Sequence, residues 1–211
     1  MTPAPTYRLL PAGTSSLLVE LDGPDDRRRL HRALLADLPD GVLELVPAQQ
    51  TVSLQCRDEA TVERAAAHVE ALLRRGLAGD DELAADPLTI EVRYDGADLA
   101  EVARIVGISP AEVVARHTGQ LWTVEFAGFM PGFGYLSGEL GGLTVPRHQT
   151  PRTRIPAGSV ALAGDLTGIY PQAFPGGWQL IGTTDAPLWQ VHRDPPALLV
   201  PGARIRFVAV D

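Results

Sequence analysis

Residues 128–136, Gly-Phe-Met-Pro-Gly-Phe-Gly-Tyr-Leu, open the stretch of sequence that decides the fold of the second half of the chain. Glycine and proline recur after it, and short β-like runs stand at 159–163 and 178–182. Helical periodicity disappears over the same stretch, while Pro201-Gly202 predicts a turn before a closing strand at 203–210. Strands that alternate with glycine-rich turns predict a β-barrel with long loops.

The first half of the chain alternates strand-like and helix-like segments. Helices are expected at 24–38, where Leu30, Leu34 and Leu38 recur on one face, and at 58–76. Strands are expected at the apolar runs around these helices, at 17–21, 42–46, 51–56 and 88–94. The order β-α-β-β-α-β predicts a ferredoxin-like sandwich, in which two helices cover one face of an antiparallel sheet. Alternatively, the last of these strands, at 88–94, begins the next domain.

A polar segment at 79–87 predicts an exposed connection between two domains. We therefore expect an α+β protein, with a ferredoxin-like α+β domain at 1–86. The barrel domain is expected at 87–211, and no internal repeat relates the two.

Two short helices are expected at the start of the second domain. Asp98 with Glu101, and Ser109 with Glu112, have the residue types and the spacing of capping boxes, in which the first side chain accepts a hydrogen bond from the helix backbone. Gly107 separates the two helices.

Composition excludes several classes of function. The formal net charge of −8 argues against binding to nucleic acid or to an anionic membrane. The start of the chain lacks the basic and apolar regions of a signal peptide, and no run approaches the ~20 apolar residues of a membrane span, so a cytoplasmic protein is expected.

The reactive side chains are restricted as well. Cys56 alternates with Val52 and Leu54 and is interpreted as a buried strand residue. Because it is the single cysteine of the chain, no intrachain disulfide can form. The 18 lysine and arginine residues are all arginine, so the chain cannot form a lysine Schiff base, carry biotin or build a P-loop. No group of histidines and carboxylates has the spacing of metal ligands, so no metal site is expected.

A local concentration of positive charge lies in the glycine-rich stretch. Between residues 139 and 165 there is no acidic side chain, but there are four basic ones: Arg147, His148, Arg152 and Arg154. Because the guanidinium group is planar and binds carboxylate or phosphate through two hydrogen bonds, this segment predicts an anion site. The alternative is that these arginines pair with acids of the N-terminal domain or of a partner subunit.

Aromatic residues of the same stretch could line a pocket for a small molecule, namely Phe129, Phe133, Tyr135, Tyr170 and Trp178. Core packing is the alternative, and it is preferred for the two phenylalanines. Asp165 and Tyr170 are the polar candidates.

The run Pro175-Gly176-Gly177-Trp178 could present successive backbone N–H groups to an anion, since glycine permits close approach and positive φ. Trp178 would then stack on an adenine or wall off the site, although a simple turn explains the glycines equally well. His117 stands where a helix should end, and it is either a general base, an anion contact or a favourable charge at the helix terminus. The structural role is preferred for it.

Several motifs in order resemble one family. They are the 128–136 segment, Pro146-Arg147, Pro151-Arg152, 156–160 (Pro-Ala-Gly-Ser-Val), 167–171 (Thr-Gly-Ile-Tyr-Pro) and 175–178. Together they resemble the family of 5-oxoprolinase B subunits, also called allophanate hydrolase subunit 1, which includes an inhibitor of a sporulation histidine kinase. The resemblance covers most of residues 90–185.

The resemblance implies a cyclophilin-like β-barrel in the second domain and ATP-dependent opening of 5-oxoproline to glutamate. It also implies two partners, the C and A subunits of 5-oxoprolinase, and ATP with Mg²⁺ as co-substrate, with no cofactor attached to this chain. The catalytic candidates are His117, Arg147, Arg152, Asp165 and Tyr170. The candidates for binding substrate or nucleotide are Tyr135, Arg154, Gly176, Gly177 and Trp178.

Two other functions stay open at this point. One is the carboxyltransferase part of a urea carboxylase or allophanate pathway, for which biotin would have to arrive on another protein. The other is a regulatory module that inhibits a histidine kinase.

Overall fold

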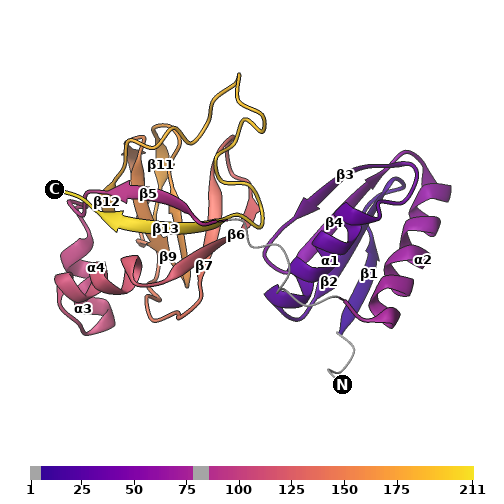
Figure 1. Cartoon of the computed structure of the whole chain (residues 1–211), viewed down its shortest axis with the longest axis horizontal. Coiled ribbons are helices and arrows are strands. Elements are labelled where there is room, and N and C mark those ends of the chain that lie inside the picture. Colours follow the sequence, from indigo (N-terminus) through magenta and orange to yellow (C-terminus); the bar gives the residue numbers. More distant parts are fainter. Residues whose placement is uncertain (1–5, 78–85) are drawn as a thin grey trace. The chain divides into compact units, whose positions relative to one another are not determined.

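The computed structural model describes residues 6–77 and 86–211, and the chain divides into two compact units, 1–83 and 84–211 (Figure 1). The predicted connection at 79–87 falls almost entirely outside the described residues. No helix of the described ranges is long and apolar enough to cross a membrane.

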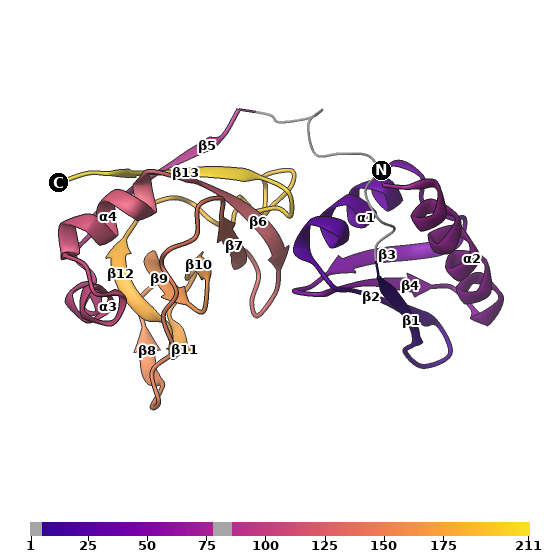
Figure 2. The same cartoon turned by 90° about the horizontal axis from the view of Figure 1, so that it is seen from below.

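The first unit is a four-stranded antiparallel sheet with two helices. Its elements are β1 (Tyr7–Pro11), β2 (Ser16–Leu21), α1 (Pro24–Ala36), β3 (Val42–Pro47), β4 (Thr51–Cys56) and α2 (Glu59–Arg75). The strands lie in the order β1-β2-β4-β3. Figure 2 shows α1 and α2 on one side of this sheet.

The core of the first unit follows from alternation along its strands. Alternate residues of β2 and β4 are buried, and Cys56 is among them as predicted. Leu30 and Leu34 bring α1 onto this face, whereas Leu38 is 44% exposed because the helix has already ended at Ala36. Asp58 caps α2 by accepting from the Thr61 N–H at 2.7 Å.

The strand β5 (Leu88–Val92) does not complete the first sheet but begins the second unit. The edge position beside β2, which a last strand would fill in a β-α-β-β-α-β sandwich, is occupied by β1 instead. The alternative assignment of this strand is therefore the correct one, and the expected strand order of the sandwich is wrong at its edge.

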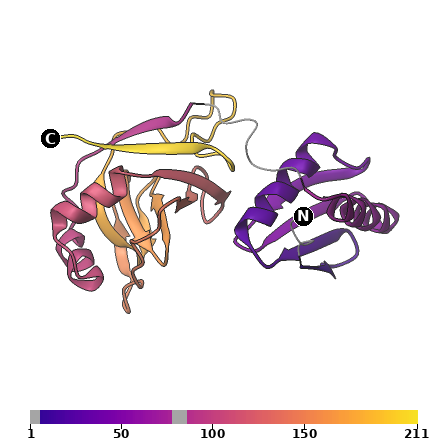
Figure 3. The same ribbon diagram turned by 60° about the horizontal axis from the view of Figure 1, so that its bottom comes forward.

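The second unit contains the remaining helices and strands. They are α3 (Leu99–Val106), α4 (Pro110–Thr118), β6 (Leu121–Ala127), β7 (Gly134–Gly138), β8 (Arg152–Ile155), β9 (Ser159–Ala163), β10 (Leu166–Ile169), β11 (Phe174–Gly176), β12 (Gln179–Thr183) and β13 (Arg204–Ala209). Figure 3 shows the two helices together at one side of the strands. They contact β12 and β13.

The main sheet of the second unit curls into a nearly closed barrel. Its order is β12-β9-β10-β7-β6-β13-β5, and β5 pairs with β13 in parallel while the other neighbours are antiparallel. The two edges meet just beyond β5, where the Arg93 N–H donates to Thr183 O at 2.8 Å and the Thr183 N–H donates to Arg93 O at 2.7 Å. The strands β8 and β11 form a separate ribbon.

The chain crosses the backbone of β12 at Gly96. The Gly96 N–H donates to Ile181 O at 3.3 Å, and the Asp98 N–H donates to Leu180 O at 2.9 Å. A Cβ atom at Gly96 would lie 2.3 Å from the carbonyl carbon of Ile181, which is far inside van der Waals contact. Only glycine fits this crossing without moving the backbone.

The two helix starts differ from each other. Ser109 caps α4 as predicted, by accepting from the Glu112 N–H at 3.1 Å. Asp98 precedes α3, but its side chain makes no capping hydrogen bond, so the predicted capping box is wrong there. Its carboxylate is instead occupied by groups from remote parts of the barrel.

Candidate functional site

A cavity of about 270 Å³ opens on the barrel unit between β7, the end of β10, the β11–β12 segment and two loops. Its lining residues are Phe129, Phe133, Tyr135, Arg147, Pro151, Tyr170, Pro175, Gly176, Gly177 and Trp178. Of these described residues, Arg147 is the one with a formal charge. The cavity is thus mostly aromatic and apolar with one cationic group, as is common for small-molecule sites.

Phe133 forms the floor of the aromatic lining. It is buried, and its ring meets those of Tyr135, Tyr170 and Trp178 edge to face at centroid distances of 4.9, 5.4 and 5.6 Å. Core packing therefore describes Phe133 correctly. These edge-to-face contacts fix the walls of the cavity before any ligand binds.

Phe129 stands at the mouth of the same cavity and does not belong to the core. It is 53% exposed, and its φ of 69° makes it a non-glycine residue in the left-handed region. Its ring packs against the exposed Phe174 at a centroid distance of 5.1 Å. Such backbone strain is retained in proteins mainly where the surrounding structure needs a side chain in one place.

Arg147 brings the positive charge to the cavity. Its guanidinium carbon lies 5.7 Å from the ring centroid of Trp178, in the range of a cation–π contact. Burial raises the pKa of the Tyr170 hydroxyl, and the charge of Arg147 offsets part of that rise. The tyrosine hydroxyls at the cavity are therefore protonated at neutral pH and can donate hydrogen bonds.

Close approach explains the glycine at 176, whereas a Cβ atom at Gly177 would make only ordinary contacts, at 3.5 Å or more. A Cβ atom at Gly176 would lie 2.4 Å from Tyr170 Oη, and the carbonyl of Gly177 accepts from the His148 N–H at 2.7 Å. Neither glycine has a positive φ, so the left-handed conformation anticipated for them is absent from these described residues. The glycine at 176 makes room for the Tyr170 side chain.

The remaining predicted arginines lie outside the cavity lining. Arg152, on β8, donates from Nη2 to Asp98 Oδ1 at 2.7 Å. The alternative, in which these arginines pair with acids of the N-terminal domain or of a partner subunit, is thus wrong for Arg152, whose acid belongs to the barrel unit. Arg154, two residues further along β8, is exposed.

His117 is fully buried in the barrel core and is not among the residues that line the cavity. Tyr94 Oη lies 2.7 Å from its Nδ1, and Thr167 Oγ1 lies 3.0 Å from its Nε2. Because the Thr167 hydroxyl donates to Ala161 O at 3.1 Å, we assign the ring hydrogen to Nε2 and the Tyr94 hydroxyl as donor to Nδ1. The ring also stacks on Phe207 at 4.4 Å.

We expect His117 to make the stability of the protein depend on pH. Burial lowers its pKa from 6.5 to about 3, so the unfolded chain binds a proton below pH 6.5 that the folded chain excludes. The free energy of unfolding should therefore fall by about 2 kcal/mol between pH 8 and pH 5 because of this residue. Urea denaturation at the two pH values measures it.

Two variants control this measurement. His117→Gln, which cannot titrate, should lose most of that pH dependence, although it is less stable overall. His192→Gln changes an exposed histidine and should keep the pH dependence of the parent. An equal pH slope for His117→Gln and the parent would contradict the assignment.

Asp165 lies in the turn between β9 and β10 and is exposed. It is not among the residues that line the aromatic cavity. The structure thus gathers Tyr135, Arg147, Tyr170 and Trp178 at the site, whereas Asp165 stays apart from them.

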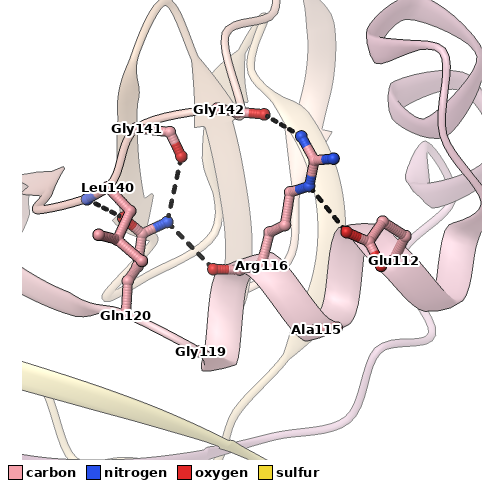
Figure 4. A pocket seen from close by; sticks show the side chains of 8 residues that line it. All are labelled: Glu112, Ala115, Arg116, Gly119, Gln120, Leu140, Gly141 and Gly142. Atoms are coloured by element: carbon pink, nitrogen blue, oxygen red, sulfur yellow. Dashed lines mark hydrogen bonds and ion pairs between the residues drawn. The ribbon is translucent and has the colours of Figure 1, made fainter.

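A second cavity, of about 400 Å³, lies beside the end of α4 (Figure 4). Its polar groups already bond to one another. Gln120 Nε2 donates to Arg116 O at 3.0 Å, Gln120 Oε1 accepts from the Leu140 N–H at 2.9 Å, and Arg116 Nε donates to Glu112 at 3.0 Å. No sequence signal pointed to this cavity, because its walls come from a helix end and a loop that are distant in sequence.

The residues of the described ranges contain no group of three or more His, Cys, Asp or Glu side chains that could hold a metal ion. Sequence reasoning also missed Phe174 and the side-chain role of Asp98. A capping pattern explained Asp98 locally, and nothing in the sequence indicated its distant partners.

Comparisons with known proteins agree with the barrel and extend the likeness to the first unit. Residues 7–199 match the family described as carboxyltransferase domain, subdomain C and D. The B subunit of 5-oxoprolinase from Escherichia coli O157:H7 is 37% identical over 208 residues, which cover 93% of each protein. The resemblance therefore reaches well beyond residues 90–185.

Solved structures show the same architecture. The crystal structure of TTHA0988 is similar with a TM-score of 0.74 and 38% identity, over 98% of this chain and 40% of that chain. This chain thus spans less than half of TTHA0988. The urea amidolyase of K. lactis has a TM-score of 0.75 at 17% identity, over 98% of this chain and 15% of the larger one, a likeness of fold alone.

Proposed function

The chain belongs to the carboxyltransferase subdomain C and D family together with 5-oxoprolinase B subunits, and from this we propose that it is the B subunit of an ATP-dependent 5-oxoprolinase. The observation that carries the proposal is the aromatic cavity with Arg147 beside Trp178. This combination suits a small cyclic molecule that carries one carboxylate.

5-Oxoproline matches both parts of the cavity. Its five-membered lactam ring would pack against the Trp178 and Tyr135 side chains, and its carboxylate would pair with Arg147. The Tyr170 hydroxyl is a protonated donor at the same cavity. A hydrogen bond from it to the lactam oxygen would polarise the amide.

The reaction that we propose consumes ATP because an amide nitrogen leaves poorly. The lactam oxygen attacks the γ-phosphorus of ATP and ADP leaves; water then adds to the activated carbon. The C–N bond then breaks, the nitrogen takes up a proton, and an acyl phosphate is left. A second water hydrolyses this acyl phosphate to glutamate and phosphate. Without lysine, the cationic side chains that this chain can offer the phosphates are arginine and protonated histidine, beside neutral donors such as backbone N–H groups. Mg²⁺ would enter with the nucleotide, as it commonly does.

Partner subunits form part of the proposal. The relatives are named as B subunits, and the TTHA0988 chain is much longer than the part that this chain matches. We propose that the C and A subunits of 5-oxoprolinase complete the enzyme, and that the chain alone is inactive.

Reconstitution tests the proposal. The purified chain is mixed with the proteins encoded beside its gene, and ADP and glutamate are measured with and without 5-oxoproline. We expect release of both products in equal amounts, only in the complete mixture. Absence of any 5-oxoproline-dependent stimulation over the individual proteins would reject the proposal.

A carboxyltransferase role is the second candidate, because the matched family is described by that activity. The same mixtures, given urea and a biotinylated carrier protein, separate the two candidates. Carrier-dependent product formation without use of 5-oxoproline would favour this second role.

A further inference from the structure

Asp98 is a buried acid that joins three separate parts of the barrel unit. It is 5% exposed, and its Oδ1 accepts from Arg152 Nη2 at 2.7 Å. Its Oδ2 accepts from the Leu180 N–H at 2.7 Å and lies 3.2 Å from His148 Nε2. His148 Nε2 makes no hydrogen bond of good geometry at this distance.

These contacts keep Asp98 ionised. Burial by itself raises the pKa of the carboxyl group, but the hydrogen bonds from Arg152 and the Leu180 N–H, with the contact to His148, outweigh it and lower the pKa overall. A buried charge is tolerated only with such partners. Because the side chain makes no capping hydrogen bond to α3, helix capping does not account for it.

Two contacts of Asp98 come from the segment that carries Arg147. His148 and Arg152 follow Arg147 in the chain and both reach Asp98. Two further bonds hold this segment against the residues on either side of Trp178: Gln179 Nε2 donates to Pro146 O at 3.1 Å, and the His148 N–H donates to Gly177 O at 2.7 Å.

The same carboxylate also bonds to β12, the strand that begins directly after Trp178. Leu180 lies two residues after Trp178, and its N–H and C=O both bond to Asp98. One residue therefore fixes the position of the Arg147 segment relative to Trp178. We infer that Asp98 is the positioning residue that holds Arg147 over Trp178 at the mouth of the aromatic cavity.

The functional meaning of this inference rests on the proposed function, because Arg147 is there the group that binds the substrate carboxylate. Its structural content does not depend on any ligand. A first experiment therefore uses the free protein, and a second uses the reconstituted enzyme.

The first experiment follows the indole N–H resonances of the ¹⁵N-labelled chain, with the Trp178 signal assigned by Trp178→Phe. Arg147→Ala gives the displacement caused by losing the stacked guanidinium. We expect Asp98→Asn to move the Trp178 resonance in the same direction, by half of that displacement or more, and to leave the Trp122 resonance in place.

Two variants keep this experiment decisive. Asp185→Asn removes an exposed carboxylate that pairs with Arg93 at 2.9 Å, and it should leave the Trp178 resonance unmoved. If Asp98→Asn does not fold, Arg152→Gln breaks the same contact from the other side and should move the resonance likewise. An unmoved Trp178 resonance in a folded variant would overturn the inference.

The second experiment is a double-mutant cycle on the reconstituted enzyme. Asp98→Asn should raise KM for 5-oxoproline about tenfold and change kcat less than about twofold, since it weakens a charged contact made on binding. In the Arg147→Ala background, Asp98→Asn should raise KM by less than about a further twofold. Equal effects in both backgrounds would show that Asp98 acts independently of Arg147.

The two experiments separate this inference from the function on which it rests. A displaced Trp178 resonance with no turnover of 5-oxoproline in any mixture would reject the proposed substrate and keep the positioning role. Turnover of 5-oxoproline with an unmoved resonance would reject the positioning role and keep the substrate.

Discussion

Arg147→Ala is expected to lower kcat/KM for 5-oxoproline about 100-fold in the reconstituted enzyme, mainly through KM. Arg147 is the charged group among the described residues that line the aromatic cavity, so its loss leaves the substrate carboxylate without its counter-charge. Release of ADP and glutamate at varied 5-oxoproline concentrations measures the effect. Thermal unfolding should change little, because Arg147 is exposed.

Two other arginine variants sharpen this prediction. Arg147→Lys keeps the charge but loses the planar fork, so an intermediate loss of about tenfold is expected. Arg206→Ala removes an exposed arginine of β13 and should leave the kinetics unchanged. If Arg147→Ala kept KM and kcat within about twofold of the parent, the carboxylate would have to bind elsewhere.

Gly96→Ala is expected to destabilise the barrel unit by about 3 kcal/mol or more. The added methyl group would meet backbone atoms of β12 at 2.3 to 2.5 Å, and backbone atoms cannot turn aside as a flexible side chain can. Urea denaturation, followed by fluorescence of the buried Trp122, measures the loss.

Gly128→Ala is the matched control for this variant. Its φ is not positive, and its added methyl group would contact only Tyr135 Cε2, at 4.0 Å. The two variants make the same chemical change in one unit, and stability should fall only for Gly96→Ala. Equal urea midpoints for Gly96→Ala and Gly128→Ala would show that the crossing of the chain over β12 has more room than the structure gives it.

The elements of the fold that depend on local pattern could be predicted from the sequence. The strand at 159–163 follows from a short β-like run, and the helix that starts at Pro24 follows from the recurrence of Leu30 and Leu34 on one face. Which strands pair could not be predicted this way, because β5 finds its neighbour β13 at the opposite end of the unit. Such pairing depends on contacts between remote segments, which no local window contains.

The residues of the candidate site also fall into those that a local pattern predicts and those that it does not. Tyr135, Tyr170 and Trp178 could be anticipated because they belong to one glycine-rich stretch that folds around a single cavity. The distinction between Arg147 and Arg154 could not, since it depends on which way a loop and a short ribbon face. Asp98 was hidden for another reason: its partners Arg152 and Leu180 lie far along the chain.

The pairing of β5 with β13 also governs when this unit can assemble during synthesis. The first strand of the unit has its sheet neighbour in Arg204–Ala209, the last strand of the unit. The sheet that contains β5 therefore cannot be completed until residues 204–209 have left the ribosome, whereas the described strands of the first unit pair with one another and are available much earlier. Until then, β5 is a strand without its partner and exposes an edge that invites aggregation.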